Sequence, residues 1–280
     1  MTPGPVENTF FFKNADGHNL YGVSHIPSDC VKIGVLFCHP FGDEKQYSYR
    51  TCASLCRRLS QAKIAAFRFD CRGFGDSDGE TIEATVTSQL QDINSAIEQF
   101  IELSGVGSVL LAGVRFGSVL AAMVAEGNPK VSGLALISPV TNGREFWQQQ
   151  IRNQQMEYLA RSEKPLTTDS VSQELKKNGR IEFEGGWFSA EMIGQINAIN
   201  LIDQPASFTG LVGVCESPGQ PVDSVINWYK TAGCRTYVGD SIEVPFWNGR
   251  TLYSHHVEQH GLVNNIVNWV SEINMERIEC

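Results

Sequence analysis

Apolar residues along this chain occur in two alternating patterns. A continuous apolar run at residues 33–38 is typical of a strand buried on both faces of a parallel sheet, and residues 131–138 indicate a second buried strand. Further strands are expected over residues 63–69, 108–114, 209–215 and 234–238. Runs with an apolar residue every three or four positions indicate helices between them; they span residues 47–60, 85–103, 116–126, 222–231 and 262–273. The alternation predicts an α/β fold with a mostly parallel central sheet and helices on both faces.

Two segments depart from this alternation. Residues 9–13 and 20–25 are strand-like, and the turn-forming run Asn14-Ala15-Asp16-Gly17 between them predicts a hairpin. From about residue 141 the chain becomes polar and glutamine-rich. There we expect helices and one short strand, over residues 143–161, 168–177, 180–184 and 189–198. We therefore expect a core of residues 1–140 and 203–280 and an inserted helical cap of residues 141–202.

The junction between the run 108–114 and the next helix carries the most specific motif. Gly113-Val114-Arg115-Phe116-Gly117 has the spacing of a nucleophile elbow, G-x-S-x-G, in which a sharp turn presents the central residue. Here that residue is Arg115, whose guanidinium stays protonated and cannot attack a carbonyl. The motif predicts the scaffold of a hydrolase without its usual nucleophile.

Two loops at the predicted carboxyl edge of the sheet extend this likeness. His39-Pro40-Phe41-Gly42 resembles the loop of α/β hydrolases that supplies an oxyanion-hole amide, and residues 70–77 (DCRGFGDS) resemble the D-x-R-G-x-G-x-S loop of the serine aminopeptidase-like branch. The resemblance implies an α/β-hydrolase fold over nearly the whole chain. It also implies an oxyanion hole formed by the backbone amides of Phe41 and Phe116. We expect His39 to be buried and to orient its loop, with a catalytic role as the alternative.

A second resemblance is narrower. Residues 39–41, 113–117, 138–140, 143–146 and 245–247 are similar to motifs of the exosortase A system-associated hydrolases of the second type. Those bacterial proteins also carry arginine at the elbow. The resemblance implies a link to exopolysaccharide production and no defined reaction.

Arg115 has two interpretations. It can bind a carboxylate or phosphate of a ligand through paired hydrogen bonds, or it can pair with Asp43, Glu44 or Glu216 and hold the loops together. A buried arginine without a partner is too unfavourable to keep, so we expect an acidic partner. Ser118 is interpreted as a hydroxyl that satisfies the backbone, with a displaced nucleophile as the alternative.

The remaining triad-equivalent positions follow from chain order. The chain order nucleophile, acid, histidine in α/β hydrolases matches Arg115, Glu216 and His256 of this sequence. His255 is the alternative to His256. Without a hydroxyl to activate, His256 can act only as a general base on water. The alternative interpretation makes both histidines surface or capping residues, and Glu216 a salt-bridge partner.

Composition and charge exclude several classes of partner. The net charge of −9 argues against nucleic acid, and the start of the chain has no signal-peptide pattern and no membrane-length apolar run. We expect a cytoplasmic protein. The eight cysteines have no disulfide or zinc spacing, so we expect buried thiols, no metal and no cofactor. The expected partner is a small molecule, either anionic or an acylated saccharide.

Two functions fit these observations. One is a non-standard ester or acyl hydrolase, or an acyltransferase. The other is a non-catalytic binding or scaffolding protein, in which Arg115 binds an anion or locks the pocket.

Overall fold

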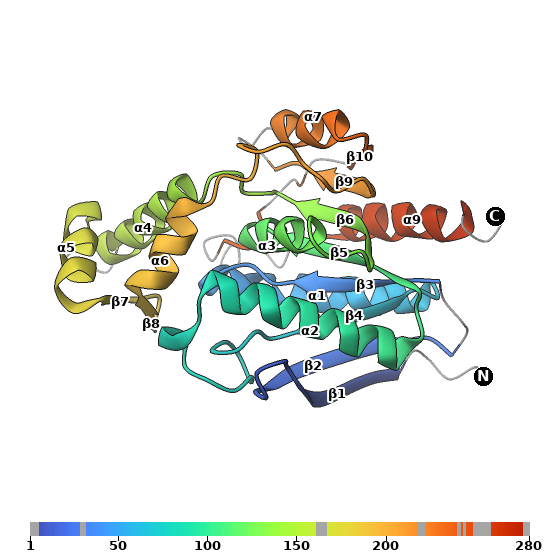
Figure 1. Cartoon of the computed structure of the whole chain (residues 1–280), viewed down its shortest axis with the longest axis horizontal. Coiled ribbons are helices and arrows are strands. Elements are labelled where there is room, and N and C mark those ends of the chain that lie inside the picture. The colour runs from blue at the N-terminus through green and yellow to red at the C-terminus, as the bar shows by residue number, and fades with distance from the viewer. Residues whose placement is uncertain are drawn as a thin grey trace.

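An eight-stranded sheet forms the centre of the molecule (Figure 1). The computed structural model describes residues 6–28, 32–160, 167–217, 222–239, 242, 245–248 and 259–276. The strand order is β1-β2-β4-β3-β5-β6-β9-β10. The six strands from β4 to β10 run parallel; they are β4 (Ala65–Phe69), β3 (Ile33–Cys38), β5 (Ser108–Val114), β6 (Val131–Ile137), β9 (Leu211–Cys215) and β10 (Arg235–Gly239). The predicted α/β-hydrolase fold with a mostly parallel sheet is confirmed.

The predicted hairpin forms the antiparallel edge of the sheet. It consists of β1 (Val6–Lys13) and β2 (Asn19–Ile26), and β2 pairs antiparallel with β4. The turn is held by the Asn14 side chain, whose Oδ1 accepts hydrogen bonds from the backbone amides of Asp16 and His18. The turn chemistry therefore acts as the sequence indicates.

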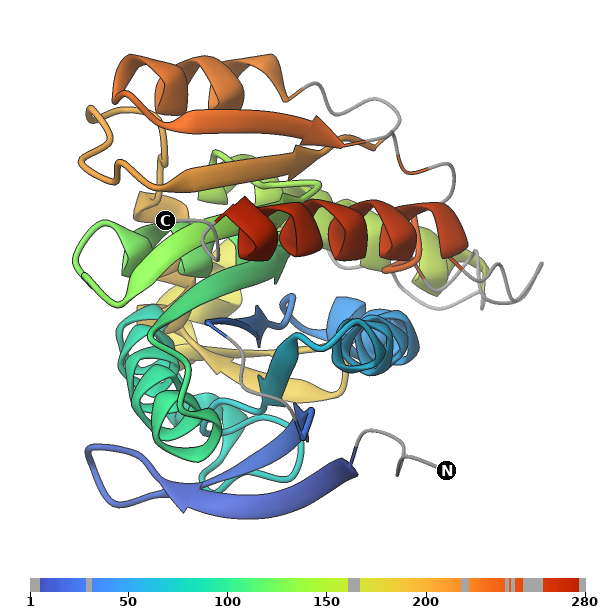
Figure 2. The same cartoon turned by 90° about the vertical axis from the view of Figure 1, so that its right-hand side faces the viewer.

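Helices cover both faces of the sheet, because each central strand is buried on both sides. In β3, Leu36 packs in one apolar cluster and its neighbours Val35 and Phe37 in the other. Figure 2 shows α1 and α2 on opposite sides of the sheet. Helices α1 (Asp43–Gln61) and α9 (His260–Glu276) pack on the cluster that contains Val35 and Phe37. Helices α2 (Val86–Ser104), α3 (Phe116–Ala125) and α7 (Asp223–Thr231) pack on the cluster that contains Leu36.

Several boundaries differ from the expectation, and one strand was not expected. Helix α1 begins at Asp43 rather than residue 47, because Asp43 and Glu44 occupy its first turn, where the helix dipole favours acidic side chains. Strand β4 begins at Ala65 rather than residue 63, because Lys63 has a left-handed φ of 64° that ends the preceding turn. Strand β8 (Gly186–Ser189), the partner of β7 (Arg180–Phe183), was not expected.

Residues 141–202, the expected cap, hold a compact group of elements between β6 and β9. The group lies beyond one end of the sheet, at the left of Figure 1. It comprises α4 (Gly143–Ala160), α5 (Thr168–Asn178), the hairpin β7–β8 and α6 (Ala190–Ala198). Strand β8 packs on the short helix η1 (Thr81–Glu83) of the core. Throughout the described part of the chain, every helix is too short or too polar to cross a bilayer.

Candidate functional site

A sharp turn between β5 and α3 places Arg115 at the carboxyl edge of the sheet. Arg115 has φ 53° and ψ −118°, a strained conformation for a residue with a side chain. The flanking glycines permit the turn. A Cβ on Gly113 would lie 2.5 Å from the Ser118 nitrogen, and one on Gly117 would lie 2.2 Å from the Cys38 carbonyl oxygen. Glycine is required at both positions because backbone, rather than flexible side chain, occupies the space.

The Arg115 side chain is buried and held from two directions. It is 2% exposed, and its Nε lies 3.4 Å from Oε1 of Glu44 at the start of α1. Its Nη2 donates to Oε1 of Gln149 on α4 at 3.0 Å. Gln150 donates to the same Glu44 oxygen at 2.8 Å. Of the three acidic partners expected for Arg115, Glu44 makes the pair. The network joins the core helix α1 to the α4 helix of residues 141–202.

Aromatic rings surround the guanidinium. Its Cζ lies 5.9 Å from the ring centroid of Phe146 and 5.6 Å from that of Trp247. These contacts favour the positively charged guanidinium.

Burial controls the charge state of Glu44. Desolvation raises the pKa of Glu44, and the Arg115 guanidinium and the Gln150 amide offset part of that rise. Its second oxygen, Oε2, has no hydrogen-bond partner among the described residues. The ion pair is therefore only partly satisfied on its acidic side.

A polar cavity of about 260 Å³ opens beside Arg115. Its described lining combines one guanidinium with four carboxylates, amides, hydroxyls and an indole; the residues are Asp43, Glu44, Tyr47, Arg115, Gln149, Gln150, Asn153, Glu157, Glu184, Ser217, Pro245, Trp247 and Asn248. This cavity is the candidate ligand site, because it lies at the elbow and carries convergent polar groups.

Glu184 reaches this cavity from the turn of the β7–β8 hairpin. It has a left-handed φ of 50°, and its Oε2 accepts a hydrogen bond from the Asp43 amide at 2.8 Å, at the N-terminus of α1. Burial raises the pKa of Glu184 to about 8, with further upward contributions from Asp43, Glu44 and Glu157. Burial and Glu157 also raise the pKa of Asp43. The cavity therefore concentrates carboxyl groups that are difficult to ionise together.

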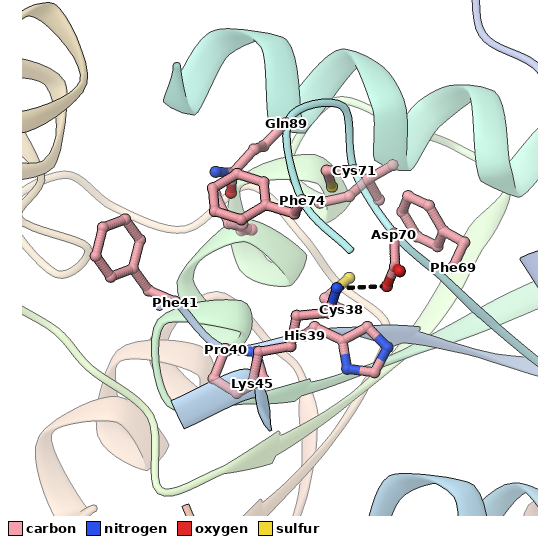
Figure 3. A pocket seen from close by; sticks show the side chains of 12 residues that line it. Cys38, His39, Pro40, Phe41, Lys45, Phe69, Asp70, Cys71, Phe74 and Gln89 are labelled. Carbon is pink, nitrogen blue, oxygen red and sulfur yellow. Dashed lines mark ion pairs between the residues drawn. The ribbon is translucent and has the colours of Figure 1, made fainter. Parts of the chain in front are cut away.

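His39 lines a second, smaller cavity of about 30 Å³ on the β4 side of its loop (Figure 3). The same cavity holds an ion pair between Lys45 and Asp70, with 2.6 Å between Nζ and Oδ1. Burial lowers the pKa of His39 to about 3, so the imidazole is neutral. Its ring stacks on Tyr49 at 6.3 Å between centroids. The residue as a whole is half-buried rather than buried as expected, although its Nδ1 is enclosed. His39 is absent from the described lining of the Arg115 cavity.

Phe41 and Phe116, the expected donors of the oxyanion hole, lie close together. Their side chains are buried and form an edge-to-face pair with centroids 6.0 Å apart. Phe116 is the first residue of α3, where an amide has no acceptor within the helix. The close approach of Gly117 to the Cys38 carbonyl brings the two loops together. Their role as amide donors stays a prediction.

The expected acid and base occupy different situations. Glu216 follows β9 and is half-buried, and its carbonyl accepts a hydrogen bond from the Ile242 amide at 2.7 Å. The next residue, Ser217, is the one that lines the cavity, and its Oγ lies 2.8 Å from that of Ser138. His255 and His256 lie outside the described residues. The triad-equivalent roles of Glu216 and His256 stay predictions.

Ser118 behaves as a structural hydroxyl. Its Oγ is buried and donates to the Gly113 carbonyl at 2.7 Å, which holds the elbow closed. The interpretation of Ser118 as a hydroxyl that satisfies the backbone is confirmed.

Several residues of the site were not predicted from the sequence. Gln149, Gln150 and Glu184 come from residues 141–202, and Trp247 follows β10. One signal was present. The run of glutamines at 148–150 lies beside Phe146 and Trp147 in a helical segment, so some amides had to be buried with partners.

The match to a protein family covers more than half of the 280 residues. The family described as "Serine aminopeptidase, S33" matches residues 30–179. This segment contains the elbow, the His39 loop and the loop after β4. A search of curated protein sequences returned no significant match.

Similar solved structures cover nearly the whole chain. Est1E from Butyrivibrio proteoclasticus with bound ferulic acid has a TM-score of 0.64 at 15% identity, covering 97% of this chain and 100% of that one. The α/β hydrolase domain-containing protein 10 from mouse has a TM-score of 0.60 at 18% identity, covering 95% and 99%. The α/β hydrolase GrgF from Penicillium gives 0.58 at 15%, covering 91% and 97%. At these identities the likeness shows the fold alone. Together with the family match, it establishes that this chain belongs to the serine aminopeptidase family of α/β hydrolases.

Proposed function

We propose that this protein is a ligand-binding member of its hydrolase family, in which Arg115 replaces the nucleophile and locks the pocket. The observation that carries the proposal is the pairing of the buried Arg115 guanidinium with Glu44 and Gln149. A guanidinium keeps its proton in proteins, so it offers no lone pair for attack on an acyl group.

The contacts of Arg115 support a positioning role. Its partners Glu44 and Gln149 come from α1 and α4, so the side chain joins the core to residues 141–202. We propose that these residues act as a cap over the cavity. Phe41 contributes a second link, because its ring packs 4.9 Å from that of Phe188 in β8. With two such links, the cap holds the polar cavity in one shape and preorganises it for a ligand.

A second candidate is hydrolysis by an activated water molecule. The observation that favours it is the approach of the Phe41 and Phe116 loops, which suits an oxyanion hole even without a serine. In this mechanism His256 or Glu216 takes a proton from water, and the developing oxyanion is stabilised by the Phe41 and Phe116 amides.

Turnover of short p-nitrophenyl esters and an acyl thioester separates the two candidates. The binding proposal predicts that hydrolysis by the wild type equals the buffer blank. Turnover that falls in His256→Ala, while Arg115→Met retains it, would favour the water mechanism and overturn the binding proposal. Catalysis by Arg115→Ser alone would mean only that a serine can be restored to the elbow.

We also propose a role in exopolysaccharide production. Its support is the resemblance of the elbow and the loops around residues 39–41, 138–146 and 245–247 to the second type of exosortase A system-associated hydrolases. Deletion of the gene in the source organism should lower secreted polysaccharide, and complementation with the wild type should restore it. Unchanged polysaccharide in the deletion strain would contradict this role.

A further inference from the structure

We propose that the free edge of β1 joins two copies of this chain into a symmetric dimer, in which the two β1 strands pair antiparallel and extend one continuous sheet. The inference is independent of the proposed binding function. Strand β1 is the first strand in the order of the sheet and pairs with β2 on one side. Figures 1 and 2 both show it at the outer edge of the sheet. Among the described residues, no strand pairs with its other side.

Hydrogen bonds around β2 show which backbone groups of β1 face the open edge. The Tyr21 amide donates to Ser77 Oγ, and the Tyr21 carbonyl accepts from the Asp70 amide. Both partners follow β4, which lies on the side of β2 away from β1. Phe11 is opposite Tyr21, so its N–H and C=O also point out of the β1–β2 ladder, towards the open edge. Because this direction alternates along a strand, every second residue of β1 does the same; these are Glu7, Thr9, Phe11 and Lys13.

This edge has few of the features that keep exposed strands from pairing. Residues 6–13 contain no proline, and their one basic residue, Lys13, is the last of the strand. The register with β2 is continuous from Val6 to Lys13, without a bulge. The side chain of Phe11 is 58% exposed. A long, regular edge that exposes an aromatic ring favours pairing with another strand.

The sequence of β1 selects one register for the pair. When Phe10 lies at the two-fold axis, Thr9 of one copy is opposite Phe11 of the other, and Glu7 is opposite Lys13. All outward-facing residues then exchange backbone hydrogen bonds, about eight in total. An axis at Thr9 or at Phe11 would leave one end residue without a partner in the opposing strand. The selected register also places opposite charges together at both ends.

The side chains on both faces of the joined sheet fit this register. On the side of α2, Phe10 is half-buried, and its ring stacks on Phe67 with 5.8 Å between centroids. At the axis the two Phe10 residues form a pair without backbone hydrogen bonds, in which side chains approach most closely. On the other face the two Phe11 rings are diagonal neighbours, a distance that aromatic side chains span. The dimer therefore covers the aromatic ring that the single chain exposes.

Sedimentation equilibrium of the wild type, from micromolar to submillimolar concentration, tests the dimer. The average mass should rise with concentration from the 30.9 kDa of one chain towards twice that value. Pairing of two strand edges buries a small area, so we expect a dissociation constant in the micromolar range. A wild type that stays monomeric at every concentration would overturn the inference.

Thr9→Pro tests whether the β1 edge forms the contact, and Thr9→Ala is its matched control. Proline removes an outward-facing N–H that the β1–β2 ladder does not use, so the variant should fold. In a symmetric dimer the donor is lost twice, and the dissociation constant should rise at least about tenfold. Thr9→Ala keeps the N–H and should bind within about threefold of the wild type. Equal dimerisation of the wild type and Thr9→Pro would overturn the assignment to this edge.

Lys13→Glu leaves the backbone unchanged and tests the register. It places two carboxylates opposite each other at both ends, because Glu7 faces position 13 of the second copy. Glu7 also pairs with Arg57 of its own chain, so we expect a weakening of about threefold to tenfold, reduced by salt. Lys176→Glu, at an exposed position of α5, makes the same charge change away from β1 and is the control. Equal dimerisation of these two variants would overturn the register.

Hydrogen exchange of single amides locates the contact directly. At concentrations that favour the dimer, the four outward-facing amides of β1 should exchange more slowly than in the dilute monomer. The intervening amides face β2 and should change little. Slower exchange elsewhere in the chain, with none in residues 6–13, would place the dimer contact on another surface and overturn the inference.

Discussion

Replacing Arg115 by methionine tests whether the guanidinium is held by Glu44. Methionine keeps an unbranched apolar stem at the strained elbow position and removes the positive charge. Glu44 then remains buried with Gln150 as its donor and no cation. Removal of one member of a buried ion pair destabilises a protein by about 3–5 kcal/mol.

Protonation of Glu44 limits this effect and makes it dependent on pH. The variant can fold with Glu44 in its neutral form. The cost is the free energy of protonating a carboxyl group whose pKa in the unfolded chain is about 4.3. At about 1.4 kcal/mol for each pH unit, this free energy of protonation is at most about 3.7 kcal/mol at pH 7 and about 1 kcal/mol at pH 5. Burial already raises the folded pKa of Glu44 in the wild type, where Arg115 offsets part of the rise. Without the guanidinium the rise is larger, so the loss of stability in the variant grows as pH rises above the unfolded value. The variant should therefore recover up to about 2.7 kcal/mol, relative to the wild type, between pH 7 and pH 5.

Urea denaturation at both pH values measures this difference. The double variant Arg115→Met with Glu44→Gln removes the titrating group and serves as the control. It should show the same destabilisation at pH 5 and pH 7, and more stability at pH 7 than Arg115→Met alone. A loss in Arg115→Met that does not change between the two pH values would refute the assigned ion pair.

Three further predictions concern the elements that build and cover the site. Gly117→Ala should lose about 3 kcal/mol or more of stability, because its Cβ would meet the Cys38 carbonyl oxygen at 2.2 Å. Gly127→Ala, whose Cβ would have no atom within 4 Å, should be tolerated and is the control. Urea denaturation of both variants measures the difference. Arg72→Ala should lose about 3 kcal/mol of stability, because Asp92 is fully buried and pairs with Arg72 Nη2 at 2.7 Å. Arg50→Ala, at an exposed position of α1, is the control. Equal losses of stability in the two variants would contradict the role of the Arg72–Asp92 pair. Glu184 has a folded pKa of about 8, above its unfolded value of about 4.3, so the wild type should lose stability relative to Glu184→Gln as pH rises between these values and no further above pH 8. A gap between the two proteins that stays constant from pH 5 to pH 8 would contradict the burial of Glu184.

The fold could be predicted in detail because its signals are local. A continuous apolar run marks a strand buried on both faces, as in β3, and glycines mark the elbow, where a side chain would meet backbone. Strand β8 was missed because Gly186–Ser189 lacks the alternation of polar and apolar residues seen in Arg180–Phe183 of β7, and because its last residue, Ser189, is also the N-cap of α6. The turn before it depends on left-handed backbone at Glu184, an uncommon conformation for a residue with a side chain.

The site could be predicted only in part, because its contacts are distant in sequence. The elbow motif identified Arg115, and chemistry required an acidic partner for it. The choice among Asp43, Glu44 and Glu216 depended on where the first turn of α1 lies relative to the elbow. Glu44 is 71 positions from Arg115. The carboxyl group of Glu184 reaches α1 from 141 positions beyond Asp43. No local pattern carries that information.

The most direct test of the central claim is labelling with a fluorophosphonate, which reacts with activated serine nucleophiles, followed by mass spectrometry of the intact protein and its peptides. Arg115 occupies the elbow, and the Ser118 hydroxyl donates a hydrogen bond to the Gly113 carbonyl. We therefore predict no mass increase of the wild type after prolonged exposure to the reagent. A serine hydrolase labelled in the same reaction confirms that the reagent is active. A stoichiometric adduct on any serine of this protein, lost on prior heat denaturation, would contradict the claim that the elbow arginine has replaced serine chemistry with a buried ion pair.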